Sequence, residues 1–465
     1  MRTFENLNNI KKVHLIGIGG VSMSAIAIVL KKAGFIVTGS DKSDGDMIQI
    51  LKDNDIPVYI GSNADLVKNV DAVVYTSAIN QHDPEYVKTK SLNIPCYERA
   101  KFLGLLLKSY KTPICICGTH GKTTTTSMIS SIFIDNNLDP NIQVGSKYAK
   151  LNNSNYRIGD SEYFILESCE YVDSFLNFSH DTATVLNIDE DHLDYFSGIE
   201  EIKKSFKKFI LMTNENGNVI MNLDDKNSMD VLDEIKNKLK EKHIKIYTFS
   251  LKNENADVYA KNLKCDKKGH YTFDVIYKDK KETFSLNVPG VHNVYDAVAA
   301  ITTSLAHNIN LEDMVTPLKE FCGARRRFEL KKELDNNVFV YDDYAHHPTE
   351  IKATLKAAKS QEHNRIIAIF QPHTYSRTKE LLDEFSKAFF DADIAIITDI
   401  YAAREIDDGT ISSKDLVEKL KENNVNAIYI SSFDDIVDYI HKNVEPNDIV
   451  ITVGAGSVTK ISDKL

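Results

Sequence analysis

The feature that most constrains the fold is a regular alternation of short apolar runs with longer helical patterns. Five apolar runs stand in residues 1–98: KKVHLIGIG, GFIVTGSD, IPVYIG, DAVVYTSA and IPCYERA. Strands that alternate with helices form parallel sheets, because each crossover helix returns the chain to the same edge. We therefore predict a doubly wound parallel sheet here, with its ligand edge in the loops that follow the strands.

Two further blocks follow. Residues 99–320 open with TPICICGTHGKT, continue through EYFILESCEY, DTATVLNIDEDHLDYF and GNVIMNLDD, and end with the antiparallel-looking piece YTFDVIYKDKKETFSLNVPG and the helix signal HNVYDAVAAITTSLA. Residues 321–465 again carry five strand-like runs: NVFVYDDYAHHP, RIIAIFQPH, ADIAIITDIYAARE, NAIYISS and DIVITVGAGS. A chain of 465 residues has room for about three domains. The prediction is an α/β protein with Rossmann-like first and third domains.

Composition limits the partners. The chain has 56 basic and 67 acidic residues and a net charge of −11, which argues against a general affinity for nucleic acid or anionic membranes. No run of eighteen apolar residues occurs and the first residues lack a signal-peptide pattern, so we expect a cytoplasmic protein without membrane insertion. The six cysteines form no CxxC pair, which favours buried, reduced thiols. We expect a monomer or a weak homodimer.

The segment ICICGTHGKTTTT, residues 114–126, predicts a strand, a phosphate-binding turn and a helix. It is a shortened form of the GxxxxGK[ST] loop, because position 116 is Ile where the full motif has Gly. Lys122 would reach the terminal phosphates of a nucleotide, and Thr123 would bind Mg²⁺ or Mn²⁺. Glu170, just after FILESC, is the best placed carboxylate for that metal, with Glu167 behind it. The central block is therefore predicted to be a P-loop ATPase α/β domain.

A second glycine turn, GIGGVS at residues 17–22, matches GxGxxG except that Ser22 replaces the third glycine. Asp41 stands where a Rossmann acid would meet a ribose hydroxyl, so a nicotinamide oxidoreductase is one interpretation. A dehydrogenase has no evident use for the lysine loop, however. The diphosphate of a UDP-sugar needs the same backbone N–H groups as NAD.

The motifs GIGGVSMSA, GTHGKTTTT, ESCEY, NIDEDHLDYF, GVHNVYDAVAA, RRRFE, DDYAHHPTEI and QPHTYSRT occur in this order, and together they resemble the Mur ligase family over nearly the whole chain. The resemblance implies that the first domain binds UDP-N-acetylmuramate by its uridine and pyrophosphate, and that the central domain binds ATP. The third domain would close over both and help to bind the amino acid. HTYSRT favours a member that adds a single L-alanine in peptidoglycan precursor synthesis.

The resemblance also implies roles for individual residues. His292 and Asn293 would lie near adenine, where Asp296 replaces an Asn that family members often carry, and Asp343 would bind the ATP ribose. Arg326 would approach the terminal phosphate, although Arg325 and Arg327 compete for that role. The implied ATP-binding set is Gly118, Thr119, His120, Gly121, Lys122, Thr123, Thr124, His292, Asn293, Arg326 and Asp343; the substrate-binding set is Gly17, Gly19, Gly20, Ser22, Asp41, Ser77, His346, His373 and Arg377; the metal ligands are Thr123, Glu170 and His192.

The implied reaction is an ATP-dependent ligation. The lactyl carboxylate attacks the γ-phosphate to give an acyl phosphate, which the amine of L-alanine then captures. Lys122, His192, Arg326 and His347 are the predicted catalytic residues, and either His192 or His347 could accept the amine proton. Three alternatives stay open: a sibling ligase that attaches a preformed peptide, a nicotinamide oxidoreductase, and a nucleotide-regulated binding protein without turnover.

Overall fold

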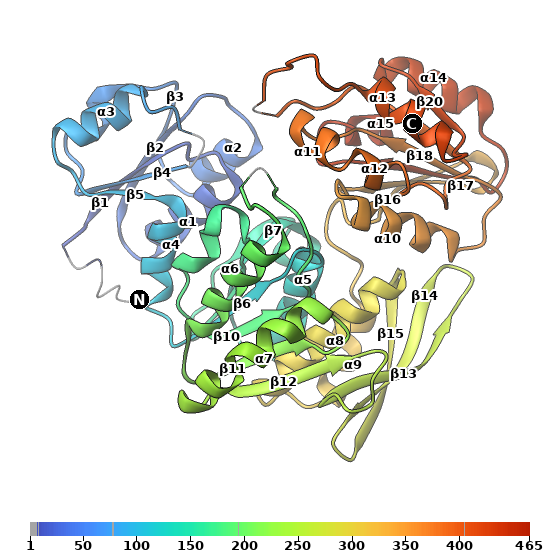
Figure 1. Ribbon diagram of the computed structural model, residues 1–465. Helices are drawn as coiled ribbons and strands as arrows, with labels where there is room; N and C mark the ends of the chain where they lie inside the picture. Colours follow the sequence, from blue (N-terminus) through green and yellow to red (C-terminus); the bar gives the residue numbers. More distant parts are fainter. Residues whose placement is uncertain (1–6, 8, 77–78, 194, 404) are drawn as a thin grey trace.

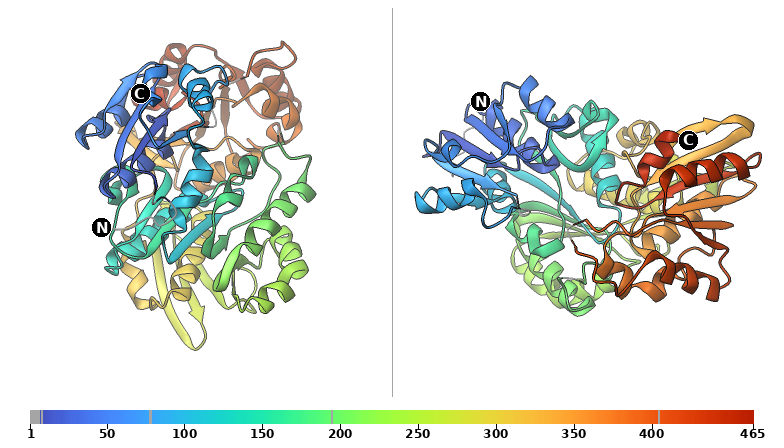
Figure 2. Two further views of the ribbon diagram at one scale, coloured as in Figure 1. Left: turned by 90° about the vertical axis from the view of Figure 1, so that its left-hand side faces the viewer. Right: turned by 90° about the horizontal axis from the view of Figure 1, so that it is seen from above.

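The computed structural model describes residues 7, 9–76, 79–193, 195–403 and 405–465. Within them the chain forms three sheets of five, ten and six strands. Each sheet lies in its own lobe (Figure 1), and from above the first and third lobes lie on opposite sides of the molecule (Figure 2). The predicted α/β class with three domains is confirmed. The predicted boundaries at residues 98/99 and 320/321 stay predictions.

All five apolar runs predicted for the first domain form strands. Their order is β3-β2-β1-β4-β5 and every pair is parallel. The order reverses beside β1, so the crevice for a ligand lies at the loops after β1 and β4. The elements are β1 (Lys12–Ile16), α1 (Val21–Lys32), β2 (Ile36–Asp41), α2 (Asp46–Asp53), β3 (Val58–Ile60), β4 (Ala72–Tyr75), α3 (Pro84–Ser91) and β5 (Cys96–Glu98).

Helix α4 (Arg99–Leu107) leads into the central domain, whose sheet has the order β15-β14-β13-β12-β11-β10-β6-β9-β7-β8. The predicted antiparallel piece is the β14–β15 hairpin. Strands β7, β8, β12 and β13 were not predicted. The strands are β6 (Thr112–Cys117), β7 (Asn141–Tyr148), β8 (Ser154–Arg157), β9 (Tyr163–Glu167), β10 (His180–Val185), β11 (Thr213–Asn222), β12 (Lys245–Ser250), β13 (Val258–Cys265), β14 (His270–Tyr277) and β15 (Lys280–Pro289).

Helix α5 (Lys122–Asp135) is the buried helix of this domain and packs against α8 (Val291–Ala306). Its first turns carry a run of hydroxyl side chains, yet they are buried. The hydroxyls of Thr126 and Ser127 donate to carbonyls four residues earlier, which satisfies them without another partner. The other helices are α6 (Ile199–Leu211), α7 (Lys226–Glu241) and α9 (Glu312–Lys319).

The third sheet has the order β16-β17-β21-β18-β19-β20. The five predicted runs form its parallel part, and β16 adds an antiparallel edge. Its sequence ELKKEL is charged, as suits an exposed edge strand. The elements are β16 (Glu329–Leu334), β17 (Val338–Asp343), α10 (Pro348–Lys359), β18 (Ile366–Phe370), α11 (Tyr375–Glu380), α12 (Leu382–Phe385), β19 (Ile394–Ile397), α13 (Ser413–Glu422), β20 (Ala427–Tyr429), α14 (Phe433–Asn443), β21 (Ile449–Val453) and α15 (Thr459–Lys464).

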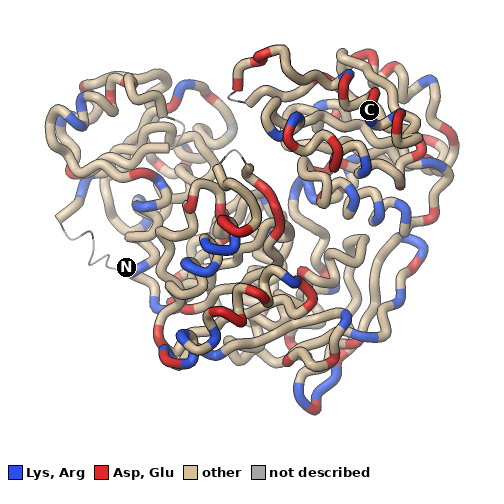
Figure 3. Tube along the Cα trace, viewed as in Figure 1, with Lys and Arg blue, Asp and Glu red and all other residues tan. Residues whose placement is uncertain are grey.

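Acidic and basic residues are interspersed over all three lobes in the view of Figure 3. Among the described helices, none has the length and apolar character needed to cross a membrane. All six cysteines are free thiols. Only Cys115 and Cys117 are buried, whereas Cys169, Cys265 and Cys322 are exposed, so the prediction of buried thiols was wrong for these three.

Candidate active site

The lysine loop joins β6 to α5. Gly118 and Gly121 have φ angles of +141° and +85°, which favour glycine. A Cβ on Gly121 would lie 2.4 Å from Oδ1 of Asp296, so this loop has no space for a side chain there. No side chain caps the N-terminus of α5. Its first backbone N–H groups are therefore available to an anion such as a phosphate.

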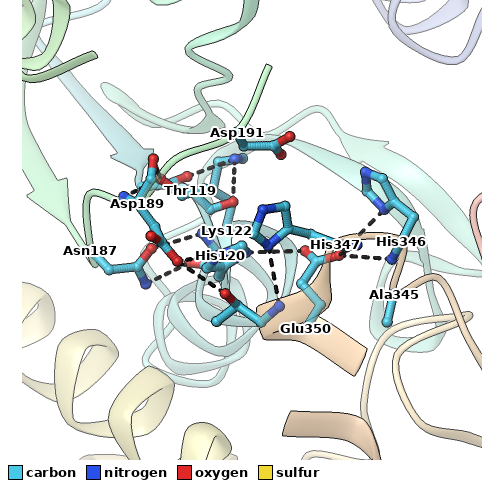
Figure 4. Close-up of polar contacts among 12 residues, drawn as sticks. Thr119, His120, Lys122, Asn187, Asp189, Asp191, Ala345, His346, His347 and Glu350 are labelled. Carbon is cyan, nitrogen blue, oxygen red and sulfur yellow. Dashed lines mark hydrogen bonds and ion pairs between the residues drawn. The ribbon is translucent and has the colours of Figure 1, made fainter. Parts of the chain in front are cut away.

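Lys122 is the cation of this loop, and its ammonium is turned inward. Its Nζ donates to the carbonyl of Thr119 at 3.0 Å (Figure 4). It also donates to the carbonyl of Gly118 at 2.6 Å and to the carboxylate of Glu170 at 3.0 Å. Burial by itself lowers the pKa of Lys122, but the carboxylate of Glu170 outweighs it and the net shift is upward. Lys122 is thus a fixed positive charge at neutral pH.

The predicted metal ligands make different contacts. Thr123 donates its hydroxyl hydrogen to Oε1 of Glu167 at 2.9 Å, whereas Glu170 pairs with Lys122. The carboxylate beside Thr123 is therefore Glu167, which sequence reasoning placed behind Glu170. His192 lies with its ring centroid 4.5 Å from that of Tyr171. Hydroxyl and carboxylate oxygens suit Mg²⁺, so Thr123, Glu167 and Glu170 fit such an ion.

A cavity of about 530 Å³ adjoins the lysine loop. It collects most of the predicted ATP-binding residues, and burial lowers the pKa of His292 to about 4, so this imidazole is neutral. Asp296 also lines it, and its Oδ1 accepts a hydrogen bond from Thr125 at 3.0 Å. The lining includes the predicted His120, Gly121, Thr124, His292, Asn293 and Asp343, the competing Arg327, and Asp224, Phe249, Lys252 and Tyr295, which were not predicted.

The three arginines of RRRF separate in space. Arg326 donates from Nε to buried Asp342 at 3.0 Å and from Nη2 to the carbonyl of Gly454, so it is held within the third domain. Arg327 instead donates to the hydroxyl of Thr123 at 3.2 Å and lines the nucleotide cavity. Arg327 therefore makes the direct contact with the lysine loop, while Arg326, which the resemblance favoured, lines a cavity that also includes Thr123.

The central and third domains meet at His120, as Figure 4 shows. The ring of His120 lies between Oδ2 of Asp189 and Oε1 of Glu350, each at 3.4 Å. Burial alone would lower the pKa of His120, but these two carboxylates raise it to about 9. Thr349 also donates to Asp189 across the same interface, at 3.1 Å. A charged His120 therefore holds the lysine loop to the start of α10.

A second cavity, of about 470 Å³, lies between the same two domains. It brings together four predicted residues: His192, His346, His373 and Arg377. Arg377 donates to Nδ1 of His373 at 3.3 Å and to Oδ1 of Asp191 at 3.2 Å. Asp191, which was not among the predicted site residues, thus links Arg377 of the third domain to the loop after β10.

A third cavity, of about 440 Å³, lies where the three domains meet. Val21 and Met47 of the first domain line it opposite Thr123 and Arg327. Lys147 and Arg325 add further positive charge, against the one carboxylate of Glu167 among the described lining residues. An elongated anionic substrate held on the first domain can therefore reach the lysine loop here.

The glycine turn of the first domain opens toward this junction. Gly17 has a φ of +77°, and the backbone N–H of Gly19 donates to Oδ2 of Asp41 at 2.8 Å. Ser22 accepts a hydrogen bond from Arg99 at 3.2 Å, and Gln143 of the central domain also donates to it. The predicted residue Ser77 lies outside the described residues.

Comparison with known proteins decides the family. Three family models match in succession: "Mur ligase family, catalytic domain" over residues 12–111, "Mur ligase middle domain" over residues 116–304, and "Mur ligase, glutamate ligase domain" over residues 326–456. The UDP-N-acetylmuramate–L-alanine ligase of Acetivibrio thermocellus is 47% identical over 98% of this chain and 96% of its own length. The chain belongs to the Mur ligase family.

Further relatives of this Mur ligase agree in length and fold. The UDP-N-acetylmuramate–L-alanine ligase of Clostridium tetani is 46% identical and covers 99% of both chains. The solved UDP-N-acetylmuramate–alanine ligase of Thermotoga maritima superposes with a TM-score of 0.80 at 27% identity over 97% of both chains. A murein peptide ligase from Psychrobacter arcticus, at 23% identity and a TM-score of 0.70, shares the fold.

Sequence reasoning missed several residues of the Mur ligase site. Asp191 and Asp189 stand in a loop already crowded with acidic residues, so no pattern distinguished them. Glu350 sits one turn into α10, where an acidic residue is ordinary helix chemistry. Lys147 and Arg325 reach the three-domain cavity only because β7 and the start of the third domain come together there.

Proposed function

We propose that this Mur ligase joins L-alanine to the lactyl carboxylate of UDP-N-acetylmuramate at the expense of ATP, through an acyl phosphate, in peptidoglycan precursor synthesis. The observation that carries the proposal is that two cavities, the nucleotide cavity and the three-domain cavity, share the lysine loop. Arg327 lines both the nucleotide cavity and the three-domain cavity, and it contacts Thr123 of the lysine loop. Relatives that carry this activity in their names match almost the full chain.

The sugar nucleotide is assigned to the first domain. Gly17, Gly19 and Gly20 form the turn before α1, whose N-terminus has no side-chain cap and can receive a diphosphate. Ser22 and Asp41 are the other residues assigned to this binding site. The lactyl carboxylate would then enter the three-domain cavity, where Lys147, Arg325 and Arg327 favour an anion.

ATP is assigned to the 530 Å³ cavity. The aromatic side chains of Phe249 and Tyr295 and the neutral imidazole of His292 provide surfaces for the base, and Asp343 lines the same space for the ribose. A divalent metal ion, when bound by Thr123 with Glu167 and Glu170, supplies positive charge beside the terminal phosphates. His192 is the candidate ligand for a second ion.

The first chemical step forms a bond between the lactyl carboxylate oxygen and the γ-phosphorus while the bond to the β-phosphate oxygen breaks. Lys122 and Arg327 face the oxygens that carry the transferring charge. Contacts of this kind are commonly worth roughly 3 kcal/mol in the transition state, or about a hundredfold in rate. ADP leaves, and the acyl phosphate stays in the three-domain cavity.

The second step forms the amide. The unprotonated amine of L-alanine attacks the acyl carbon, and the tetrahedral species collapses to the amide as phosphate leaves and takes up the amine proton. Arg377 and His373 are placed to hold the alanine carboxylate, and Asp191 fixes the guanidinium of Arg377. Contacts of the third domain with His120 and Asp191 close this space, which protects the acyl phosphate from water.

Phosphate release from ATP tests the proposal. The expected result is release that requires both UDP-N-acetylmuramate and L-alanine, with an alanylated sugar nucleotide as product. Release driven only by a preformed peptide would point to the sibling ligase, and hydride exchange with NAD would point to an oxidoreductase. Absence of alanylated product at saturating ATP and Mg²⁺ would refute the proposal.

A further inference from the structure

His347 is the N-cap of helix α10, and its side chain rather than its backbone makes the cap. Nδ1 accepts a hydrogen bond from the backbone N–H of Thr349 at 3.3 Å. Glu350 completes the capping box, because its Oε2 accepts the backbone N–H of His347 at 3.3 Å and that of His346 at 3.0 Å. The lone pair of Nδ1 is therefore in use.

This cap fixes the tautomer of the ring. Burial lowers the pKa of His347, so the imidazole is neutral at physiological pH. A neutral imidazole has one N–H group and one nitrogen lone pair. With the lone pair on Nδ1 directed at Thr349, the hydrogen atom must stand on Nε2. His347 is therefore a hydrogen-bond donor at its other edge and has no lone pair there to accept a proton.

That donor is buried and has no partner among the described residues. The residue as a whole is 5% exposed. An unsatisfied buried donor costs about 1–3 kcal/mol, and nearly all such groups in folded proteins find a partner. The unpartnered Nε2–H thus indicates that an acceptor arrives with a ligand.

The surroundings of the ring identify that ligand as part of the reaction. The ring centroid of His347 lies 5.2 Å from that of His120, which belongs to the lysine loop. In Figure 4 the ring of His347 lies beside His120, below Lys122 and Asp191. The charged groups that act on His347 are Asp191, His120, Glu350 and Asp189. A phosphate group on the lysine loop would bring oxygen acceptors to this edge.

We propose that His347 donates a hydrogen bond from Nε2 to an oxygen of the transferring phosphoryl group, and that it is not the base that deprotonates alanine. The proposal rests on the function proposed above. No proton leaves His347 in either step: its N–H group shares the charge of the phosphate oxygens, and the amine proton ends on the departing phosphate. This removes His347 from the two histidines predicted as base.

A cation site is the competing interpretation. His120, Asp189 and His347 each offer one possible ligand atom, and these three atoms lie within 4.8 Å of one another, as in a loose metal site. A metal ion at Nε2 would need the lone pair on that nitrogen, which moves the hydrogen to Nδ1 and places it against the N–H of Thr349. Metal binding would therefore break the cap of α10, so the geometry favours an anion.

Two substitutions separate the two edges of the ring. In His347→Asn the amide oxygen takes the place of Nδ1 and keeps the cap, since Asn is a good N-cap residue, but no donor reaches the position of Nε2. In His347→Gln an amide N–H lies near the position of Nε2 while the cap is weakened. We expect His347→Asn to keep the melting temperature and the alanine KM but to lower kcat about 100-fold. His347→Gln should recover part of kcat at a lower melting temperature.

The pH profile and the ring itself give two further readouts. The acid limb of kcat/KM for alanine should persist in His347→Asn; its disappearance would identify His347 as the base and overturn the proposal. In ¹⁵N-histidine spectra of the full chain, the His347 signal is assigned as the one that disappears in His347→Asn. This signal should show the Nε2–H tautomer, and its chemical shift should change when ADP and inorganic phosphate are added.

These spectra need no turnover, so they distinguish the inference from the proposed function. The opposite tautomer, or a signal that responds to Zn²⁺ alone and not to ADP with phosphate, would contradict the inference. Failure of the chain to alanylate its donor would instead refute the proposed function and leave the tautomer and the phosphate response to decide the role of His347.

Discussion

The two glycine loops are alike in outline and differ in their surroundings. Each follows the first strand of its domain, turns through a glycine with positive φ and enters a helix without a side-chain cap, although Gly20 before α1 is extended and Gly121 before α5 is left-handed. The loop of the first domain meets one carboxylate, Asp41, and has no lysine. The loop of the central domain carries Lys122, which pairs with Glu170, and Thr123, which contacts Glu167 and Arg327.

This difference indicates what a loop needs to catalyse phosphoryl transfer in addition to binding a phosphorylated ligand. Backbone N–H groups suffice to hold a diphosphate that stays intact. Moving a phosphoryl group requires fixed charges that face the oxygens on which charge develops. Among the described residues, the first loop contacts Asp41 and, at Ser22, Arg99, whereas Lys122 and its partner Glu170 stand at the central loop. The predictions below test this division, starting from the largest expected effect.

Lys122→Ala should separate the roles of the two glycine loops most clearly. Loss of its ammonium removes the fixed cation of the lysine loop, so kcat should fall by about 1000-fold or more. Binding of UDP-N-acetylmuramate, measured by calorimetry, should change less than threefold because that ligand is held on the other loop. Equal loss of turnover and of sugar-nucleotide binding would show that the loops do not act separately.

Arg377→Ala should affect neither loop. Because Arg377 contacts His373 and Asp191 in the 470 Å³ cavity, its loss should raise the alanine KM about 100-fold while the KM for ATP stays the same. His373→Ala should act in the same direction. Lys379→Ala is the matched control, since Lys379 lies on the same helix and donates to Thr410 instead. Unchanged alanine kinetics in Arg377→Ala would remove it from the amino-acid site.

Asp41→Ala tests whether the glycine loop of the first domain binds the sugar nucleotide. Without the acceptor for Gly19 N–H the turn loses its one side-chain support, and the KM for UDP-N-acetylmuramate should rise about 10-fold with the ATP KM constant. Asp44→Ala, three residues further along and exposed, serves as control. A change in the ATP KM alone would contradict the assignment of this loop to the sugar nucleotide.

Asp296→Asn should give the smallest effect and a dependence on pH. Burial raises the pKa of Asp296 from 3.8 to about 7. Between these values the folded state binds more protons than the unfolded state, so the free energy of unfolding falls as pH rises. Wild type should therefore be less stable than Asp296→Asn by about 1–3 kcal/mol at pH 8, and the gap should shrink at pH 5. The urea midpoints of the two proteins at pH 5 and pH 8 measure this difference in stability. A difference that does not change with pH would exclude Asp296 as the titrating group.

Much of the fold follows from local pattern. Ten apolar runs in the first and third domains form the predicted parallel strands. Central strands such as β1 and β21 are buried on both faces and therefore carry a continuous apolar sequence. The missed strands lie toward sheet edges or in the extension β12–β13, where one face is exposed and the sequence is mixed. Strand β16 is the clearest case, since its charged residues protect an edge and erase the apolar signal.

The sequence by itself determined the loops: Gly118, Gly121 and Lys122 act through spacing of a few residues, which local chemistry fixes. Only the tertiary structure decided which distant side chains meet them. Arg327 rather than Arg326 donates a hydrogen bond to Thr123, and Glu167 rather than Glu170 accepts the hydrogen bond from the Thr123 hydroxyl. The hydrogen bond from the Thr349 N–H to Nδ1 sets the tautomer of His347. The contact of Arg327 depends on packing between domains and that of Glu167 on the packing of α5 against β9, whereas the cap is local to α10. Neighbours in sequence differ at these places by the direction in which the backbone points them.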